Sequence, residues 1–135
     1  MSDPVSRPEH YVKNSVVVGD RVYEPIDLCE MLDFTLGNAV KYLIRHRDKG
    51  RPAQDLAKAR WYLERILRTE HIKLDSDVPG LPADKLVLLA FAFAAKNEFL
   101  YTLFNDRFEL VTRQSIEQTI SLITRALEHY GEYLQ

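Results

Sequence analysis

Cationic and polar side chains recur at helical spacing in the first half of this 135-residue chain. The first series follows the spacing i, i+3, i+7 and i+11: Asn38, Lys41, Arg45 and Lys49. This spacing aligns side chains along one face of an α-helix, and Tyr42 lies at the edge of that face. Because cations held in such a row repel one another, the series indicates a surface that binds an anion.

A second series stands on the next predicted helix: Asp55, Lys58, Tyr62 and Arg65. If the two helices pack through their apolar faces, both polar series converge on one edge of the pair. Lys and Arg would then bind phosphate, Asn would supply a hydrogen bond, and the tyrosines would offer rings for stacking. Asp55 would orient a cation. The other interpretation of this pattern is a solvated helix face that binds nothing.

The apolar positions show which elements must carry these side chains. Residues 36–48 and 53–69 each repeat apolar side chains on one face, at a period of about 3.6 residues. The two apolar faces are Leu36, Ala39, Val40, Leu43 and Ile44, then Leu56, Ala59, Leu63, Ile66 and Leu67. A Gly50-Arg51-Pro52 turn separates the two segments, which predicts an antiparallel αα-hairpin. We expect Trp61, which lies off the apolar face, to pack under the C-terminal helices.

The rest of the chain predicts further helices and one small β element. Residues 16–23 favour a hairpin around Gly19-Asp20, and Pro25 opens a helix to about residue 32 with Asp27 in its first turn. Thr35 is the expected N-cap of the helix that follows. The other expected segments are a linker at 71–83, a helix at 84–104, and a last helix to residue 133 that begins with a Ser115/Gln118 capping box. The sequence thus predicts one all-α domain over residues 1–135, a helical bundle built on the αα-hairpin, with a C-terminal helical pair at 84–134.

Composition and motifs exclude several classes of function. The net charge of −2 gives no basic field for duplex DNA, although Lys and Arg outnumber acids in residues 41–68. The single cysteine, Cys29, permits no intrachain disulfide, and no motif of a P-loop is present. The histidines lack the spacing of metal ligands, so we expect no metal site: His10, His46, His71 and His129. Residues 1–13 do not resemble a signal peptide, and the longest apolar run, 86–95, is too short to cross a bilayer, which favours a cytoplasmic protein without a membrane partner.

The apolar run at residues 86–95 also bears on assembly. A helix on the surface of a monomer should show a polar face, and this run shows none before Lys96. Small residues such as Ala90, Ala92, Ala94 and Ala95 would let a partner helix approach closely. We expect a homo-oligomer, in the first place a symmetric dimer through this helix. The alternative is that the helix lies at the centre of a compact monomer.

The two polar series coincide with the motif of a known family. Residues 9–68 resemble the SaV-like family of small bacteriophage proteins, whose pattern is roughly G-N-x-x-K-Y-x-x-R followed by D-L-x-K-A-x-W-Y-L. His10-Tyr11 and Ile26-Asp27 match two further parts of that pattern. The resemblance implies a nucleotide-binding protein, and one member, from a short-tailed coliphage, resembles a kinase of deoxynucleoside monophosphates. We predict that His10 and Tyr11, which no packing argument from the sequence explains, fold over the hairpin and close the nucleotide site.

Two functions follow from the resemblance together with the cationic series. In a nucleotide kinase, Lys41, Arg45 and Lys58 would be the catalytic residues that clamp phosphates and neutralise developing charge, with a nucleoside triphosphate as phosphate donor. The alternative is a non-catalytic protein that sequesters a nucleotide, for example a host signalling nucleotide. A phage-encoded protein of either kind would act in the host cytoplasm.

Overall fold

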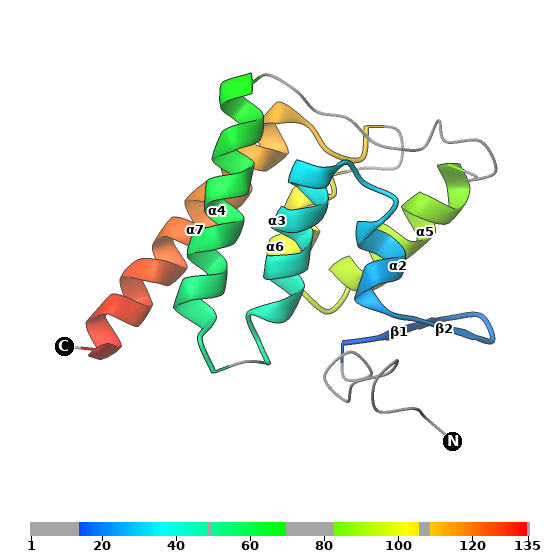
Figure 1. Ribbon diagram of the computed structural model, residues 1–135, viewed down its shortest axis with the longest axis horizontal. Coiled ribbons are helices and arrows are strands. Elements are labelled where there is room, and N and C mark those ends of the chain that lie inside the picture. The colour runs from blue at the N-terminus through cyan, green and yellow to red at the C-terminus, as the bar shows by residue number, and fades with distance from the viewer. Residues whose placement is uncertain (1–13, 49, 70–82, 106–108, 135) are drawn as a thin grey trace.

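Two antiparallel helices form the centre of the fold. The computed structural model describes residues 14–48, 50–69, 83–105 and 109–134. Figure 1 shows α3 (Phe34–Arg45) running down and α4 (Pro52–Thr69) running back up beside it, with α2 (Pro25–Cys29) on the other side of α3. The predicted αα-hairpin is therefore confirmed. The linker expected at 71–83 lies outside the described residues, except for residue 83.

The β element is a two-stranded antiparallel hairpin, as the sequence predicts. Strand β1 (Val16–Val18) pairs with β2 (Arg21–Tyr23), and Val18 stands opposite Arg21. A two-residue loop of this kind needs a left-handed conformation, which Gly19 adopts with a φ of 66°. Val16 is buried, and β1 packs on α5 (Ala83–Ala94), so the hairpin gains a core contact that it could not provide for itself.

Helix α2 is shorter than predicted and ends at Cys29 rather than near residue 32. Pro25 occupies its first turn, and the Asp27 carboxylate accepts a hydrogen bond of 2.7 Å from the backbone amide of Glu24. This contact satisfies an amide at the helix start that has no partner within the helix. Asp27 therefore has a structural role at the start of α2.

Helix α3 begins two residues earlier than predicted, because Asp33 and not Thr35 is its N-cap. The Asp33 carboxylate accepts a hydrogen bond of 2.9 Å from the amide of Leu36. Both residues are good N-caps by type, and a periodicity argument cannot choose between neighbours two residues apart. Close contact between α2 and α3 depends on Gly37, since a Cβ there would lie 2.8 Å from the Cys29 carbonyl oxygen.

The core lies between the hairpin and the C-terminal helices. The apolar positions predicted on α3 and α4 are buried, except that Leu67 is only half-buried. Helix α7 (Arg113–Leu134) packs on α4 and on α6 (Glu98–Leu103), and contributes Ile116 and Ile123 to this core. Burial of these side chains is the main favourable contribution to folding.

The helix predicted at residues 84–104 is wrong as a single element. The structure has α5 and α6 instead, separated at Ala95–Asn97. Asn97 caps α6 by accepting hydrogen bonds from the amides of Phe99 and Leu100, and its side-chain amide donates to the Leu43 carbonyl of α3. The buried Asn97 side chain thus caps α6 and connects it by a hydrogen bond to α3 of the central hairpin.

The capping box predicted at the last helix also lies one turn too late. Thr112 and Ser115 form it, and their side chains exchange hydrogen bonds with each other's backbone amides at 3.0 and 2.9 Å. Helix α7 therefore begins at Arg113, and Ser115 is in its first turn.

In the part of the chain that the structure describes, one side of helix α5 is buried in the core and the other is exposed. Leu86, Leu89, Ala90, Phe93 and Ala94 are buried in the core, while Leu88 and Phe91 are exposed. Two of the small residues expected to face a partner helix, Ala90 and Ala94, thus face the chain's own interior. Among the described residues, no helix is both long and apolar enough to span a membrane.

Candidate functional site

The structure brings six of the predicted site residues together where α3 and α4 face each other. We call this surface the α3–α4 edge: Lys41, Tyr42, Arg45, Asp55, Lys58 and Tyr62. Its centre is a ring pair, because Tyr42 of α3 and Tyr62 of α4 stack with centroids 6.1 Å apart and planes inclined by 14°. The two tyrosines are half-buried and turn toward each other across the helix pair.

Two lysines use this ring pair as a platform. The Lys41 ammonium lies 4.5 Å from the centroid of the Tyr42 ring, and the Lys58 ammonium lies 5.3 Å from the same centroid. Both distances are within the range of a cation–π interaction. One ring therefore holds a cation from each helix, although both lysines remain exposed.

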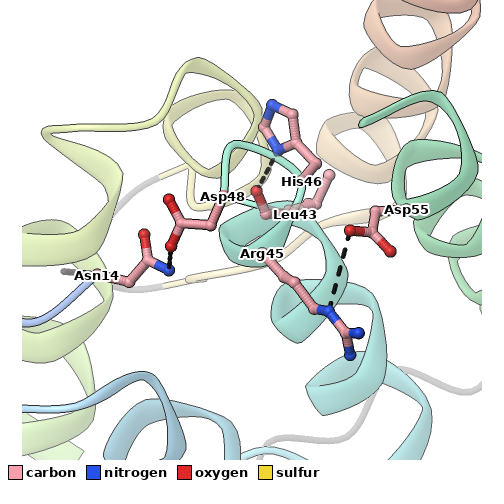
Figure 2. A network of polar contacts seen from close by, with 6 residues as sticks. All are labelled: Asn14, Leu43, Arg45, His46, Asp48 and Asp55. Carbon is pink, nitrogen blue, oxygen red and sulfur yellow. Dashed lines mark hydrogen bonds and ion pairs between the residues drawn. The ribbon is translucent and has the colours of Figure 1, made fainter. Parts of the chain in front are cut away.

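An ion pair closes the edge at the end near the helix turn. Figure 2 shows Arg45 reaching from α3 toward Asp55 of α4, with Arg45 Nε 4.0 Å from Asp55 Oδ2. The Asp55 side chain is 7% exposed and that of Arg45 is 42% exposed. Neither Arg45 Nε nor Asp55 Oδ2 has a hydrogen-bond partner, although both atoms are buried. Asp55 thus lies beside Arg45, but the pair is too long to be a hydrogen bond.

Asn38 lies at the other end of α3, away from this ion pair. Its side-chain amide donates a hydrogen bond of 2.8 Å to the Phe34 carbonyl oxygen, one turn earlier. Asn38 and Lys41 also line a pocket of about 350 Å³ between α2 and α3, together with Ile26, Cys29 and Phe34. The polar series on α3 therefore borders α4 at one end and this pocket at the other.

Trp61 belongs to this surface, and its predicted packing under the C-terminal helices is wrong. Its side chain is 53% exposed. The indole meets the Tyr62 ring edge to face at 5.1 Å, and the Arg68 guanidinium lies 5.8 Å from the indole centroid. Trp61 stands three residues after Lys58 on the helix, a spacing that places neighbours on one face and could have indicated its position.

Other residues of the basic stretch have different positions. Arg60 donates a hydrogen bond to Thr124 of α7 and pairs with Glu64, so it supports packing between helices. Arg65 is exposed on α4. The predicted site residues His10, Tyr11 and Lys49 lie outside the described residues.

His46 and Cys29 lie close to the edge, but both are kept neutral. Burial lowers the pKa of the His46 imidazole, and its Nδ1 lies 2.5 Å from the Leu43 carbonyl oxygen, so Nδ1 carries the proton and donates. Figure 2 shows the ring turned away from Arg45 and Asp55. Burial also raises the pKa of the Cys29 thiol to about 12, against a smaller opposing effect of the Lys41 charge. A thiol with that pKa is a poor nucleophile at neutral pH.

The α3–α4 edge can therefore attract and hold an anion. It carries three cations against one carboxylate, and that carboxylate is buried. Within the described ranges, no three His, Cys, Asp or Glu side chains gather in a way that could hold a metal ion. Trp61 adds an exposed aromatic surface next to Tyr62, whereas Tyr42 and Tyr62 stack on each other.

Comparison with known proteins adds one finding. A family model described as a protein of unknown function (DUF3310) matches residues 5–64, which include α2, α3 and most of α4. No curated protein and no solved structure matches the chain.

Proposed function

We propose that this protein binds nucleotides through their phosphates at the α3–α4 edge and transfers a phosphoryl group to deoxynucleoside monophosphates. The observation that carries the proposal is that Lys41 of α3 and Lys58 of α4 meet over the Tyr42 ring, with Arg45 beside Asp55 on the same edge. Ammonium and guanidinium groups are the usual protein ligands of phosphate. A base stacked on exposed Trp61 would supply the apolar part of the contact.

The proposed reaction needs no general base. In the donor triphosphate, the bond between the β,γ-bridging oxygen and the γ-phosphorus breaks, and a phosphate oxygen of the monophosphate forms a new bond to that phosphorus. The attacking oxygen carries no proton at neutral pH, because the second pKa of a phosphate monoester is about 6. The products are two nucleoside diphosphates. Lys41, Arg45 and Lys58 would hold the reacting phosphates and offset the charge on the transferring oxygens.

Sequestration of a nucleotide is the second candidate function. It is favoured by the burial of Asp55, which leaves the six residues of the edge without an exposed carboxylate that could bind a metal-bound phosphate. Tight binding of one nucleotide without turnover would then be the activity, and a host signalling nucleotide is one possible ligand.

The two functions separate in one experiment. The protein is incubated with each deoxynucleoside monophosphate and each nucleoside triphosphate, and the nucleotides are resolved by anion-exchange chromatography. The kinase proposal expects equal amounts of two diphosphates. Binding by calorimetry without products would support sequestration instead, and neither binding nor products would overturn both functions.

Charge-neutral variants test the site. Lys41→Met and Lys58→Met each remove one cation near the Tyr42 ring, and each should weaken nucleotide binding by about tenfold or more, because a charge-assisted hydrogen bond is lost. Arg113→Gln is the matched control: it removes an exposed cation on α7, which pairs with Glu117 on the same helix. Equal effects of all three variants would show that general charge, and not this edge, governs binding.

We further propose that the protein self-associates as a homodimer or a higher homo-oligomer and acts in the cytoplasm, the host cytoplasm if a phage encodes it. Support for self-association comes from the exposed apolar side chains Leu88, Phe91 and Tyr101 on α5 and α6. Support for the cytoplasm comes from the proposed substrates, which are cytoplasmic metabolites.

A further inference from the structure

The pocket between α2 and α3 lies next to the proposed phosphate site and has no assigned role. It has a volume of about 350 Å³, and its walls are mostly apolar: Ile26, Cys29, Leu32, Phe34 and Gly37. Asn38 and Lys41 line it on the α3 side, and Glu30 and Asp33 on the side of α2 and the α2–α3 turn. We call this pocket the α2–α3 groove.

Exposed apolar side chains border the groove. The Phe34 side chain is 78% exposed at the first residue of α3, and Ile26 of α2 is also exposed. Cys29 adds an uncharged thiol, since its pKa is about 12. An exposed phenyl ring beside a shallow apolar hollow offers a flat ligand one face for stacking.

Lys41 connects the groove with the α3–α4 edge. The same residue lines the groove and lies over the Tyr42 ring. Phe34 and Lys41 are seven residues apart, which is about 10 Å along the axis of α3. Figure 1 shows α3 between α2 and α4. The groove is lined by residues of α2 and α3, whereas Trp61 belongs to α4.

We propose that the α2–α3 groove is the subsite for the nucleoside of the deoxynucleoside monophosphate, with its phosphate at Lys41, while the triphosphate lies along α4 with its base on Trp61. This inference rests on the proposed kinase function and divides its site into acceptor and donor halves. The charges support the division. Among the residues that line the groove, Lys41 is the only cation and Glu30 and Asp33 are acids, so the groove suits an uncharged nucleoside and only its Lys41 end suits a phosphate. Helix α4 carries Lys58, Arg65 and Arg68 for a triphosphate.

The division also orders the reacting groups. With the acceptor phosphate at Lys41 and the donor's γ-phosphate between Lys41, Lys58 and Arg45, the two phosphates meet over one patch of positive charge. The acceptor oxygen then attacks the γ-phosphorus as the β,γ-bridging oxygen leaves with the bonding electrons, and each substrate departs as a diphosphate from its own half of the site.

Trp61 makes the two halves separately measurable, because it is the only tryptophan of the chain. The full-length protein is titrated with a non-hydrolysable triphosphate analogue while Trp61 fluorescence is followed, and with a deoxynucleoside monophosphate by calorimetry. The analogue should change the Trp61 fluorescence. When both ligands are present, each chain should bind one molecule of each.

Phe34→Ala should weaken monophosphate binding by about tenfold, which is the loss expected for one aromatic stacking contact. It should leave the fluorescence titration with the analogue unchanged. Val17→Ala, a truncation of an exposed apolar side chain on β1, is the matched control.

Each result bears on a different claim. Unchanged monophosphate affinity in Phe34→Ala, or equal weakening of both ligands, would overturn the division while leaving nucleotide binding intact. Competition between the monophosphate and the analogue for one site would overturn it as well. Failure of the wild-type protein to bind either ligand would overturn the proposed function itself, and the division with it.

Discussion

At the scale of single residues, aromatic and cationic side chains on the edge depend on one another. The Tyr42 ring has Tyr62 stacked beside it and two lysine ammonium groups within 4.5 and 5.3 Å of its centroid. Without the ring, mutual repulsion and hydration would draw the lysines apart. The ring therefore keeps two cations close together before any ligand arrives, which lowers the ordering cost of binding an anion.

The first prediction concerns this ring. Tyr42→Leu should weaken nucleotide binding by roughly two- to tenfold, because each cation–π interaction at an exposed site contributes about 0.5–1 kcal/mol. Tyr42→Phe keeps the ring and removes only the hydroxyl, so its affinity should stay near the wild-type value. Calorimetric titration of both variants measures the difference. If Tyr42→Phe weakens nucleotide binding as much as Tyr42→Leu does, the phenol hydroxyl and not the ring is the important group.

The second prediction concerns His46, which is buried and packs edge to face on Phe99 at 5.2 Å. Burial lowers its pKa from the ordinary 6.5, so the unfolded chain binds the proton more readily than the folded one. The stability linked to this group is therefore fully present above pH 6.5 and decreases as the pH falls toward the lowered pKa. Urea unfolding between pH 7.5 and 5 should show a steeper loss of stability for the wild-type protein than for His46→Gln. Parallel curves for the two proteins would contradict this linkage.

At the scale of elements, the contact between α2 and α3 shapes the proposed acceptor groove. Gly37 lies in this contact, and the Cys29 carbonyl oxygen occupies the space that a Cβ would need. Gly37 also lines the groove, so the distance at which α2 packs on α3 also determines the width of the groove.

The third prediction weighs two opposing effects of Gly37→Ala. Alanine favours a helix over glycine by about 1 kcal/mol. Against this, overpacking costs about 1–3 kcal/mol, and the obstructing atom belongs to the backbone, which cannot rotate away. We expect a net loss of about 1 kcal/mol in the free energy of unfolding, measured in urea, together with weaker monophosphate binding. A variant that is more stable and binds the monophosphate normally would contradict this expectation, because it would show that α2 moves to accommodate the added methyl group without loss of stability.

The elements differ in how far the sequence could predict them. The α3–α4 hairpin and its polar edge were predictable because two long amphipathic helices with a turn between them leave few alternatives. The break between α5 and α6 was not predictable. The apolar run at 86–95 has no polar residues at a regular spacing that would mark a helix end, and Asn97 bonds to the Leu43 carbonyl oxygen, which belongs to a helix distant in sequence. The packing of Trp61 was predicted wrongly for a similar reason. On a helical wheel it lies between the apolar and the polar face of α4, and only the packing of α7 on α4 determines which of these positions is covered.

At the scale of the whole molecule, two separate regions each gather exposed apolar side chains. Ile26 and Phe34 border the α2–α3 groove, while Leu88, Phe91 and Tyr101 lie on α5 and α6. Phe91 and Tyr101 line one hollow, whose other lining residues are uncharged: Thr102, Phe104, Asn105 and Gln118. We call the second region the α5–α6 patch.

The fourth prediction is that the α5–α6 patch pairs with its own copy. A two-fold interface places the same surface on both sides, so it is favoured by a patch without charges that would repel each other. Leu88 is on the same face of α5 as Phe91, one turn away, and the Tyr101 side chain is 73% exposed.

Light scattering at micromolar concentration should therefore give twice the chain mass of 15.7 kDa. Leu88→Asp should give the monomer mass, since it would bury two carboxylates in the interface. Ser121→Asp adds the same charge at an exposed position of α7 and should remain dimeric. A wild-type mass of 15.7 kDa would exclude the assembly and leave the patch exposed on a monomer.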